Sequence, residues 1–345
     1  MADARTNRFR TALDLIGASG LHHVFSALTR GAGIVFTLHH VRPWDGRAFA
    51  PNRLLEITPD FLETVLTYLA EIRYEVVSLD EAVARLAHPG ERRFASFTFD
   101  DGYRDVRDHA LPVLRRFNAP AALFITTSFA DGTGDLWWLT LESAIAKSSS
   151  VRFGGEEMDT STVAAKDAAW EKIYWKLRAM SEMRMREEIA GLAERAGTDA
   201  SDAAKHLCMS WDELRTVAQD PLVTIGNHTV HHYMLAKHPE SVMREEIAET
   251  QTRIASELSI TPRHIAYPVG DPTSAGAREF RAAKDMGLCG WTTRLGLLFP
   301  EHKDHTSALP RVSLNGYYQE KKYAELFVSG LPFAINNRFR RVNVD

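Results

Sequence analysis

Cysteine is scarce in this sequence, with only Cys208 and Cys289 among 345 residues and no CxxC spacing between them. This scarcity argues against a disulfide framework and a thiolate zinc site, and it favours a reducing compartment. No window approaches the roughly 18 unbroken apolar residues of a membrane span, so we expect no stable membrane insertion. The N-terminal region also lacks the continuous apolar core of a signal peptide, which predicts a cytoplasmic protein, peripheral at most to the inner membrane.

No block of basic residues occurs, because 41 basic and 45 acidic side chains are scattered through the chain and give a formal charge of -4. We therefore expect no nucleic-acid partner. The sequence has neither GxGxxG after an apolar run nor GxxxxGK[ST], which weakens nucleotide-binding architectures. The remaining composition, 45% hydrophobic and 25% charged, is that of a folded protein of unknown oligomeric state.

Short β-rich runs alternate with helical stretches along much of the chain. The runs occupy 33–39, 74–79, 94–99, 121–126, 222–226, 264–268, 288–293 and 311–314, and the helical stretches 60–72, 79–87, 104–117, 239–258 and 275–286. Continuous apolar strands separated by helices are typical of a parallel sheet covered by helices. We favour an α/β barrel over an open doubly wound sheet, because the nucleotide-binding signatures of the latter are missing.

The alternation stops over 129–209, where the apolar spacing is helical and we predict no strand. We interpret this stretch as a helical insertion in one strand-to-helix connection. Ser210 and Glu213 form a capping-box pattern that marks the next helix. Insertions after barrel strands lie at the catalytic mouth, so Trp137 and Trp138 either line a substrate groove or anchor the insertion to the core.

Two terminal segments flank the predicted barrel domain of residues 33–330: an N-terminal helical segment, 1–32, and a C-terminal tail, 331–345. Apolar residues repeat at helical spacing over 9–28, and an amphipathic helix of this kind more often packs on its own domain than on a membrane. Its apolar positions are Phe9, Leu13, Ile16, Leu21, Phe25 and Leu28.

Two adjacent carboxylates, Asp100 and Asp101, follow the apolar run 94–99 in the sequence FTFDDGY. Neighbouring strand residues point to opposite faces, so both carboxylates reach one site only if the backbone turns there, as Gly102 permits. In isolation, such a sequence is more often a turn in which one Asp caps the following helix.

A histidine pair, His228 and His232, follows the predicted strand 222–226 in GNHTVHHYM. The four-residue spacing predicts both imidazoles on one side of a helical turn, with His231 turned away. Both this pair and the Asp pair then lie at the same rim of the barrel. Two His and one carboxylate form a three-ligand metal set, which leaves the second carboxylate free to act as a general base.

The sequence resembles the polysaccharide deacetylase family, the NodB-homology domain of carbohydrate esterase family 4. The family's TFDDG motif matches residues 98–102, and its H-[S/T]-x-x-H motif matches 228–232. The resemblance covers about 33–315 less the insertion, and it implies a distorted (β/α) barrel of about seven strands. It also implies a carbohydrate substrate and a divalent metal, usually zinc. The implied roles are base for Asp100 and metal ligand for Asp101, His228 and His232.

The family's later motifs are altered here. Its third motif, R-x-P-Y-G in type, stands as AYPVG, with Ala266 in place of the Arg and Val269 in place of the Tyr. The backbone N–H of Val269 can still help to hold an oxyanion, because that task needs no side chain. The sequence LPRVSL resembles a version of the family with an L-P-R segment before the last strand, so we expect Arg311 to pair with Asp100.

The late L-x-x-H-D motif, which carries the family's catalytic acid, is absent, since RVSLNGYY contains no His. His39, in TLHHV at the end of the first strand, resembles the Y-H-x-[VI] segment of a branch of the family and is our candidate acid, with His40 pointing away. The alternative is that backbone groups at the strand end satisfy the His39 ring.

These features predict a metal-dependent hydrolase that removes acetyl groups from N-acetylated amino sugars of a poly- or oligosaccharide resembling a chitooligosaccharide. An O-acetyl esterase and a non-catalytic carbohydrate-binding protein on the same scaffold stay open as alternatives. A metalloprotease is disfavoured because HExxH needs Glu where Thr229 stands. A non-haem iron oxygenase is disfavoured because its usual double-stranded β-helix would not give this alternation of strands and helices.

Overall fold

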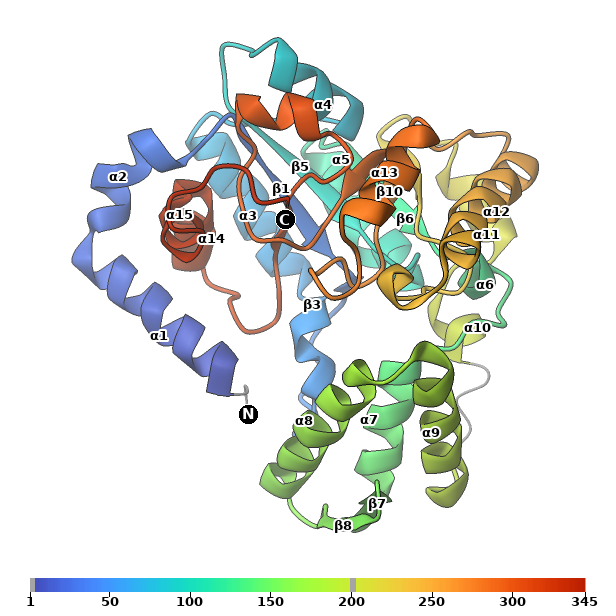
Figure 1. Ribbon diagram of the computed structural model, residues 1–345. Helices are drawn as coiled ribbons and strands as arrows, with labels where there is room; N and C mark the ends of the chain where they lie inside the picture. The colour runs from blue at the N-terminus through green and yellow to red at the C-terminus, as the bar shows by residue number, and fades with distance from the viewer. Residues whose placement is uncertain (1–3, 199–202, 345) are drawn as a thin grey trace.

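A parallel β-sheet forms the centre of the protein, whose computed structural model describes residues 4–198 and 203–344 (Figure 1). Its strands follow the order β11-β10-β9-β6-β5-β1-β12, and β4 pairs beside β5. The strands are β1 Gly33–Leu38, β4 Glu75–Val76, β5 Phe94–Phe99, β6 Ala121–Ile125, β9 Val223–Asn227, β10 His264–Ala266, β11 Cys289–Trp291 and β12 Val312–Ser313. Each of the eight predicted runs coincides with one of these strands, and only β9 extends one residue beyond its run.

The sheet curls until its two ends approach each other. Leu309 forms a parallel bridge with Trp291 of β11, and its backbone N–H donates to the Gly290 carbonyl at 2.8 Å. Three residues later, Val312 of β12 pairs with Phe36 of β1 at the other end. Strands β1 and β5 are buried along their whole length, which is why their sequences are continuously apolar. The predicted distorted (β/α) barrel is confirmed.

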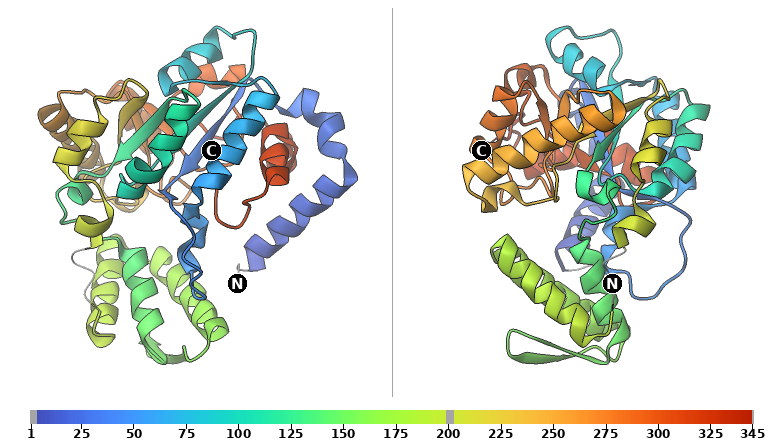
Figure 2. Two further views of the ribbon diagram at one scale, coloured as in Figure 1. Left: turned by 180° about the vertical axis from the view of Figure 1, so that it is seen from behind. Right: turned by 90° about the vertical axis from the view of Figure 1, so that its right-hand side faces the viewer.

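Helices cover the outside of the sheet, and all five predicted helical stretches are found (Figures 1 and 2). They are α3 Pro59–Glu71, α4 Leu79–Ala87, a π-helical turn Val106–Ala110 continued by α5 Leu111–Arg116, α12 Glu240–Leu258 and α13 Ala277–Asp285. Helix α11, Trp211–Val217, begins at the capping box of Ser210 and Glu213, as the sequence predicts.

Most of the chain between β6 and α11 projects from one end of the barrel as a separate group of helices, whereas the short helix that directly follows β6 stays beside the barrel (Figures 1 and 2). The whole stretch contains α6 Thr127–Ala130, α7 Trp137–Lys147, α8 Val163–Ala179, α9 Glu182–Arg195 and α10 Ala203–Leu207. The prediction of no strand here is wrong, because β7 Ser150–Phe153 and β8 Glu156–Asp159 form an antiparallel hairpin. Gly154 and Gly155 make its two-residue turn with φ of 60° and 81°, a conformation that favours glycine.

The N-terminal segment forms two helices where the sequence predicts one. Helix α1, Ala4–Ser19, ends before Gly20, whose φ of 66° breaks the helix, and α2, Leu21–Thr29, follows. Leu13 of α1 is fully buried and α1 packs against α14, Lys321–Ser329. Helix α2 packs against α14 and α15, Leu331–Asn336, but its apolar residues Leu21, Phe25 and Leu28 are exposed. The predicted packing of this apolar face therefore holds only for its first half.

No helix among the described residues combines the length and the apolar character needed to cross a membrane.

Candidate functional site

A pocket of about 280 Å³ opens at the carboxyl ends of the parallel strands. Its lining includes residues that directly follow β1, β5 and β9, residues of the loop after β10, and side chains from the inserted helices. This is the rim where barrel enzymes place their chemistry. All nine residues singled out in the sequence line it: His39, Asp100, Asp101, Trp137, Trp138, His228, His232, Val269 and Arg311.

The two carboxylates reach one pocket because the backbone turns sharply between them. Asp100 continues the strand, since its N–H donates to the Leu38 carbonyl at 2.9 Å. Asp101 and Gly102 then both adopt left-handed conformations with φ of 70°. The turn that the sequence assigns to Gly102 thus begins one residue earlier, at an Asp that tolerates this region better than most residues do. Both carboxylates are almost completely buried.

Asp101, His228 and His232 together have the arrangement of a metal site. The Nε2 atoms of His228 and His232 lie 3.4 Å and 3.3 Å from Asp101 Oδ1, and one ligand atom from each residue lies within 4.8 Å of the others. His228 Nδ1 lies 2.7 Å from the carbonyl of Ala266 and must donate to it, which leaves a lone pair on Nε2. Asp101 Oδ1 is buried without a hydrogen-bond partner among the described residues. These donors fit a divalent cation with open coordination positions.

The histidines converge by a route that the sequence does not predict. Residues 228–234 form an irregular loop and not a helical turn, and Thr229 and His232 have left-handed φ values of 66° and 56°. These two reversals bring the imidazole centroids of His228 and His232 within 5.0 Å. His231 turns away as predicted, with Nδ1 2.6 Å from Glu246 Oε1.

Burial and neighbouring charges shift the ionisation of the three candidate ligands. Burial raises the pKa of Asp101, but the nearby imidazoles of His232, His228 and His39 outweigh it, and the net shift is downward. Burial lowers the pKa of His232 to about 3, so this imidazole is neutral near pH 7. For His228 the nearby carboxylates of Asp101 and Asp100 outweigh burial and raise the pKa.

Arg311 holds Asp100 in a bidentate ion pair. Its Nη1 donates to Asp100 Oδ1 at 2.7 Å and its Nη2 to Oδ2 at 2.8 Å, while Nη1 also contacts the Thr98 hydroxyl at 2.9 Å. Arg311 is completely buried. Burial raises the pKa of Asp100, but the Arg311 charge and hydrogen bonds lower it more, so the carboxylate stays ionised. The pairing expected from the LPR segment is present.

Val269 occupies a strained turn at the edge of the pocket. Its φ of 63° is rare for a β-branched residue, and Gly270 follows with φ of 68°. The Thr293 hydroxyl donates to the Val269 carbonyl at 2.7 Å. Among the described residues no acceptor is bound to the Val269 N–H, which leaves this donor available to a ligand.

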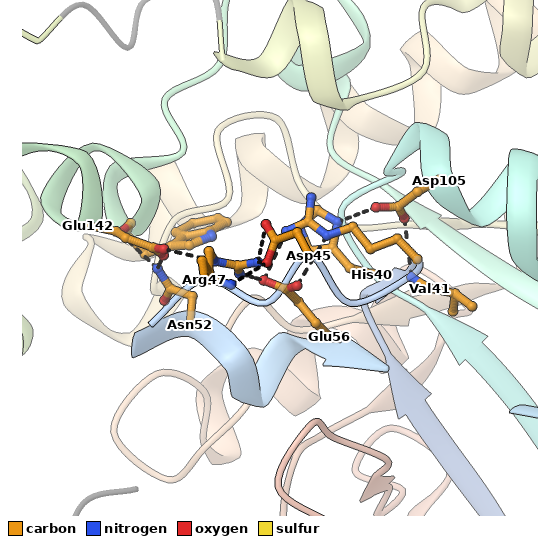
Figure 3. A network of polar contacts seen from close by, with 10 residues as sticks. His40, Val41, Asp45, Arg47, Asn52, Glu56, Asp105 and Glu142 are labelled. Carbon is orange, nitrogen blue, oxygen red and sulfur yellow. Dashed lines mark hydrogen bonds and ion pairs between the residues drawn. The ribbon is translucent and has the colours of Figure 1, made fainter. Parts of the chain in front are cut away.

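His39 and His40 separate at the end of β1. His39 lines the pocket. Burial lowers its pKa, and the carboxylates of Asp101 and Asp100 raise it by less, so the net shift is downward. His40 points elsewhere, as the alternation predicts, and its Nδ1 lies 2.6 Å from Asp105 Oδ2 (Figure 3). Its ring stacks on Tyr103 with the ring centroids 3.6 Å apart.

A polar network joins the segment after β1 to the insertion (Figure 3). Strands β2, His40–Val41, and β3, Glu56–Ile57, pair at its base. Arg47 contacts both Glu56 and Glu142, and Asn52 Nδ2 donates to Glu142 Oε2 at 2.7 Å and to the Trp138 carbonyl at 3.1 Å. Asn52 itself lines the pocket, so this network sets the distance between the insertion and the carboxylates.

An aromatic row on the insertion forms the outer wall of the pocket. Trp170 and Tyr174 of α8 stack at 4.6 Å, and Trp137 stacks on Tyr174 at 5.5 Å. Beside them, Arg178 Nη2 lies 2.8 Å from Asp271 Oδ2. Trp170, Tyr174, Arg178 and Asp271 line the pocket but are not predicted from the sequence. The available signal is the recurrence of the first three at i, i+4 and i+8 on one face of α8.

Trp137 and Trp138 have features of both roles considered from the sequence, lining a groove and anchoring the insertion. Each lines the pocket, yet their exposed fractions are only 3% and 6%. The Trp138 ring lies 5.1 Å from the His232 ring and 6.3 Å from the Phe129 ring of α6, so it contacts the candidate metal ligand and also packs against a buried aromatic side chain.

Comparison with known proteins gives a family and a fold. The family model described as polysaccharide deacetylase matches residues 87–290. Among solved structures, IcaB from Ammonifex degensii is 18% identical with a TM-score of 0.55, over 86% of this chain and 97% of that one. PplD, a Streptococcus pyogenes deacetylase in complex with acetate, is 15% identical with a TM-score of 0.54, over 82% and 92%. A de-N-acetylase from Aggregatibacter actinomycetemcomitans is 13% identical with a TM-score of 0.54, over 85% and 99%.

Sequence comparison with curated proteins finds no match. At these low identities the structural likeness speaks to the fold alone. The family match is independent of it and spans more than half of the chain. The chain belongs to the polysaccharide deacetylase family.

Proposed function

We propose that the protein is a metal-dependent N-deacetylase that removes acetyl groups from the amino sugars of a poly- or oligosaccharide resembling a chitooligosaccharide. One observation carries the proposal: a single pocket holds an ionised carboxylate paired with a buried arginine and, beside it, a separate Asp-His-His set. The first arrangement suits a general base and the second a divalent cation.

The residues that would hold the metal are Asp101, His228 and His232. When bound, a divalent cation such as zinc supplies Lewis-acid polarisation of the acetyl carbonyl and favours deprotonation of the attacking water.

The chain's own residues supply the remaining steps. Asp100 takes a proton from the attacking water, and Arg311 keeps its carboxylate ionised and oriented. The Val269 N–H donates to the oxygen of the former carbonyl as negative charge develops there. The carbon–nitrogen bond then breaks, and His39 gives a proton to the departing amine. Burial lowers the pKa of His39, so its imidazole is neutral before the reaction. It becomes the acid after it receives the proton that Asp100 took from the water, and transfer of this proton to the amine restores both side chains.

A carbohydrate substrate suits the aromatic wall, because the apolar faces of sugar rings stack on aromatic side chains. Trp170 and Tyr174 are partly exposed and line the pocket beside the carboxylates. Among the structural neighbours, one is a deacetylase in complex with acetate and another a de-N-acetylase, which agrees with release of acetate from an amide.

Acetate release from N-acetylated chitooligosaccharides by the purified chain, before and after a chelator and after zinc is returned, tests the proposal. We expect release that stops with chelator and recovers with zinc. Release only from O-acetylated oligosaccharides would favour the esterase alternative. Binding of oligosaccharides without acetate release, in protein shown to contain metal, would favour the non-catalytic alternative and contradict the proposal.

The metal-ligand assignment predicts that His228→Ala loses its metal. Removal of one of three protein ligands should reduce the bound zinc from about one equivalent to near zero, measured by elemental analysis after dialysis. His231→Ala is the matched control, because this neighbouring side chain is half exposed and pairs with Glu246 instead. Equal metal content in His228→Ala and His231→Ala would contradict the assignment.

The aromatic wall predicts a chain-length effect. Trp170→Ala should raise KM for a longer oligosaccharide by about 2- to 10-fold, from about 0.5–1.5 kcal/mol per stacked aromatic pair, and change KM for the shortest substrate less. Trp175→Ala is the control, since Trp175 lies on the same helix with 45% of its surface exposed but does not line the pocket. An equal change in KM for all chain lengths would contradict a role of the aromatic wall in binding the substrate.

A further inference from the structure

Exposed apolar side chains gather on one face of the molecule, away from the pocket described above. Eleven large apolar side chains are exposed in the described part of the chain, and seven of them lie within residues 15–28 and 335–339. Isolated exposed apolar residues are ordinary on protein surfaces, but a cluster of this kind indicates an interaction site. We call six of the seven the α2 face: Leu21, Val24, Phe25, Leu28, Ile335 and Phe339.

Helix α2 has the reverse of the usual polarity of a surface helix. Leu21, Val24, Phe25 and Leu28 recur at i, i+3, i+4 and i+7, the spacing of one apolar stripe, yet all four are exposed. Val24 and Leu28 keep 74% and 71% of their surface in solvent. The side of the helix next to this stripe, about a quarter turn away, buries the polar His22 and Thr29 where α2 packs against α14 and α15. A helix that buries its polar side and exposes its apolar stripe is poorly suited to water.

The α2 face continues into an apolar pocket with a basic edge. This second pocket, about 270 Å³, is lined by Phe25, Leu28, Phe333 and Phe339, and by residues of the loop at 296–299. Arg340 and Arg341 also line it, and no carboxylate does. It shares no residue with the pocket that holds Asp100.

The charge beside the α2 face is positive, although the whole chain carries -4. Residues 338–341 include three exposed arginines. Within the described ranges, Arg338 and Arg340 make no ion pair, whereas Arg341 pairs with Glu301 at 2.8 Å. A second copy of this chain placed on the same face would bring these like charges together, whereas an anionic surface would neutralise them.

We propose that the α2 face docks on a lipid bilayer that contains anionic phospholipids. Helix α2 lies along the interface with its apolar stripe at the boundary between headgroups and acyl chains, and Arg338 and Arg340 contact lipid phosphates. The docking is interfacial, because the chain has no helix suited to cross the bilayer among its described residues. It does not depend on the proposed deacetylase activity, since the two pockets are separate.

Co-sedimentation of the full chain with vesicles of phosphatidylcholine, with or without phosphatidylglycerol, tests the docking. We expect binding to the phosphatidylglycerol vesicles that weakens as salt is raised, and little binding to pure phosphatidylcholine. Val24→Asp with Leu28→Asp should lower the affinity at least about 10-fold, because both side chains lose apolar burial in the interface. Arg338→Glu with Arg340→Glu should reduce only the part of binding that needs phosphatidylglycerol.

Met183→Asp is the matched control, since Met183 lies on α9 and is 73% exposed, much like Val24 and Leu28. It should bind vesicles as the unmodified chain does. Circular dichroism and thermal unfolding check that each variant is folded. If the double variant on α2 does not fold, the double arginine variant still tests the docking. Undiminished vesicle binding by both pairs would overturn the proposal. So would a dimer in light scattering that Leu28→Asp dissociates while the unmodified chain binds no vesicles.

Discussion

Asp100→Asn should lower the turnover of the N-acetylated substrate by about 10²- to 10⁴-fold, the contribution of a positioned general base, while the chain keeps its metal. The amide has the size of the carboxylate but takes no proton from water at neutral pH. Its oxygen can still accept from Arg311, although its amino group cannot, so one of the two hydrogen bonds at 2.7 Å and 2.8 Å is lost. The candidate metal ligand Asp101 is unchanged, which separates this variant from a ligand variant.

Metal content, turnover and thermal unfolding should be measured together on the same preparation. Asp105→Asn is the matched control, because Asp105 lies at the start of the next helix, pairs with His40 at 2.6 Å and does not line the pocket. Asp101→Asn should lose metal and turnover together. If Asp100→Asn turned over as fast as the unmodified chain, Asp100 would not be the general base, whatever the metal content.

The barrel is predictable from the sequence because its strands are buried on both faces and therefore appear as continuous apolar runs, as at 33–38 and 94–99. The hairpin at 150–159 escapes the same reasoning. Only alternate residues of β7 are buried and β8 is largely exposed, so its four-residue strands carry no apolar run. Its one signal is the pair Gly154 and Gly155 between them. The break of the N-terminal helix does have a local signal, because Gly20 adopts a left-handed φ of 66°, but the apolar spacing over 9–28 continues across it and hides the break.

The candidate site, like the fold, is predictable from the sequence only in part. Asp100, Asp101, His228 and His232 lie in two short motifs whose chemistry is visible residue by residue. Their geometry is not visible there, because left-handed conformations at Asp101 and His232 depend on the surrounding fold. The aromatic wall is harder to predict. Its residues recur on one face of α8, but long-range contacts such as the ion pair between Arg178 and Asp271 hold that helix over the pocket, and no local pattern encodes them.

Arg311→Met should impair both the stability and the activity of the protein, because Asp100 then stays buried without its cation. Loss of one partner of a buried, hydrogen-bonded pair costs about 3–5 kcal/mol of unfolding free energy. Arg311 also donates to the Thr98 hydroxyl and the Thr292 carbonyl, so both acceptors lose a partner. Misplacement of the base should lower turnover by about 10²-fold at neutral pH. Chemical denaturation and acetate release measure the two effects.

The pH dependence distinguishes an electrostatic role of Arg311 from a merely structural one. With Arg311 present, the pKa of Asp100 in the folded protein lies below its usual value despite burial. The pair therefore stabilises the fold fully at pH values above the pKa of Asp in the unfolded chain. This stability is lost as the pH falls through the lower pKa of the folded protein. Without Arg311, burial dominates and the pKa rises. The acidic limb of kcat/KM should then move to higher pH, and the variant should become less stable, relative to the unmodified chain, as pH rises.

The double variant Arg311→Met with Asp100→Asn completes the argument, because it removes the uncompensated charge together with its partner. It should regain part of the unfolding free energy lost in Arg311→Met, since a neutral amide is easier to bury than a carboxylate, but none of the turnover. The non-additive part of this cycle measures the coupling of the two side chains. Strictly additive losses, with an acidic limb that does not move in Arg311→Met, would mean that Arg311 supports the barrel without controlling the base.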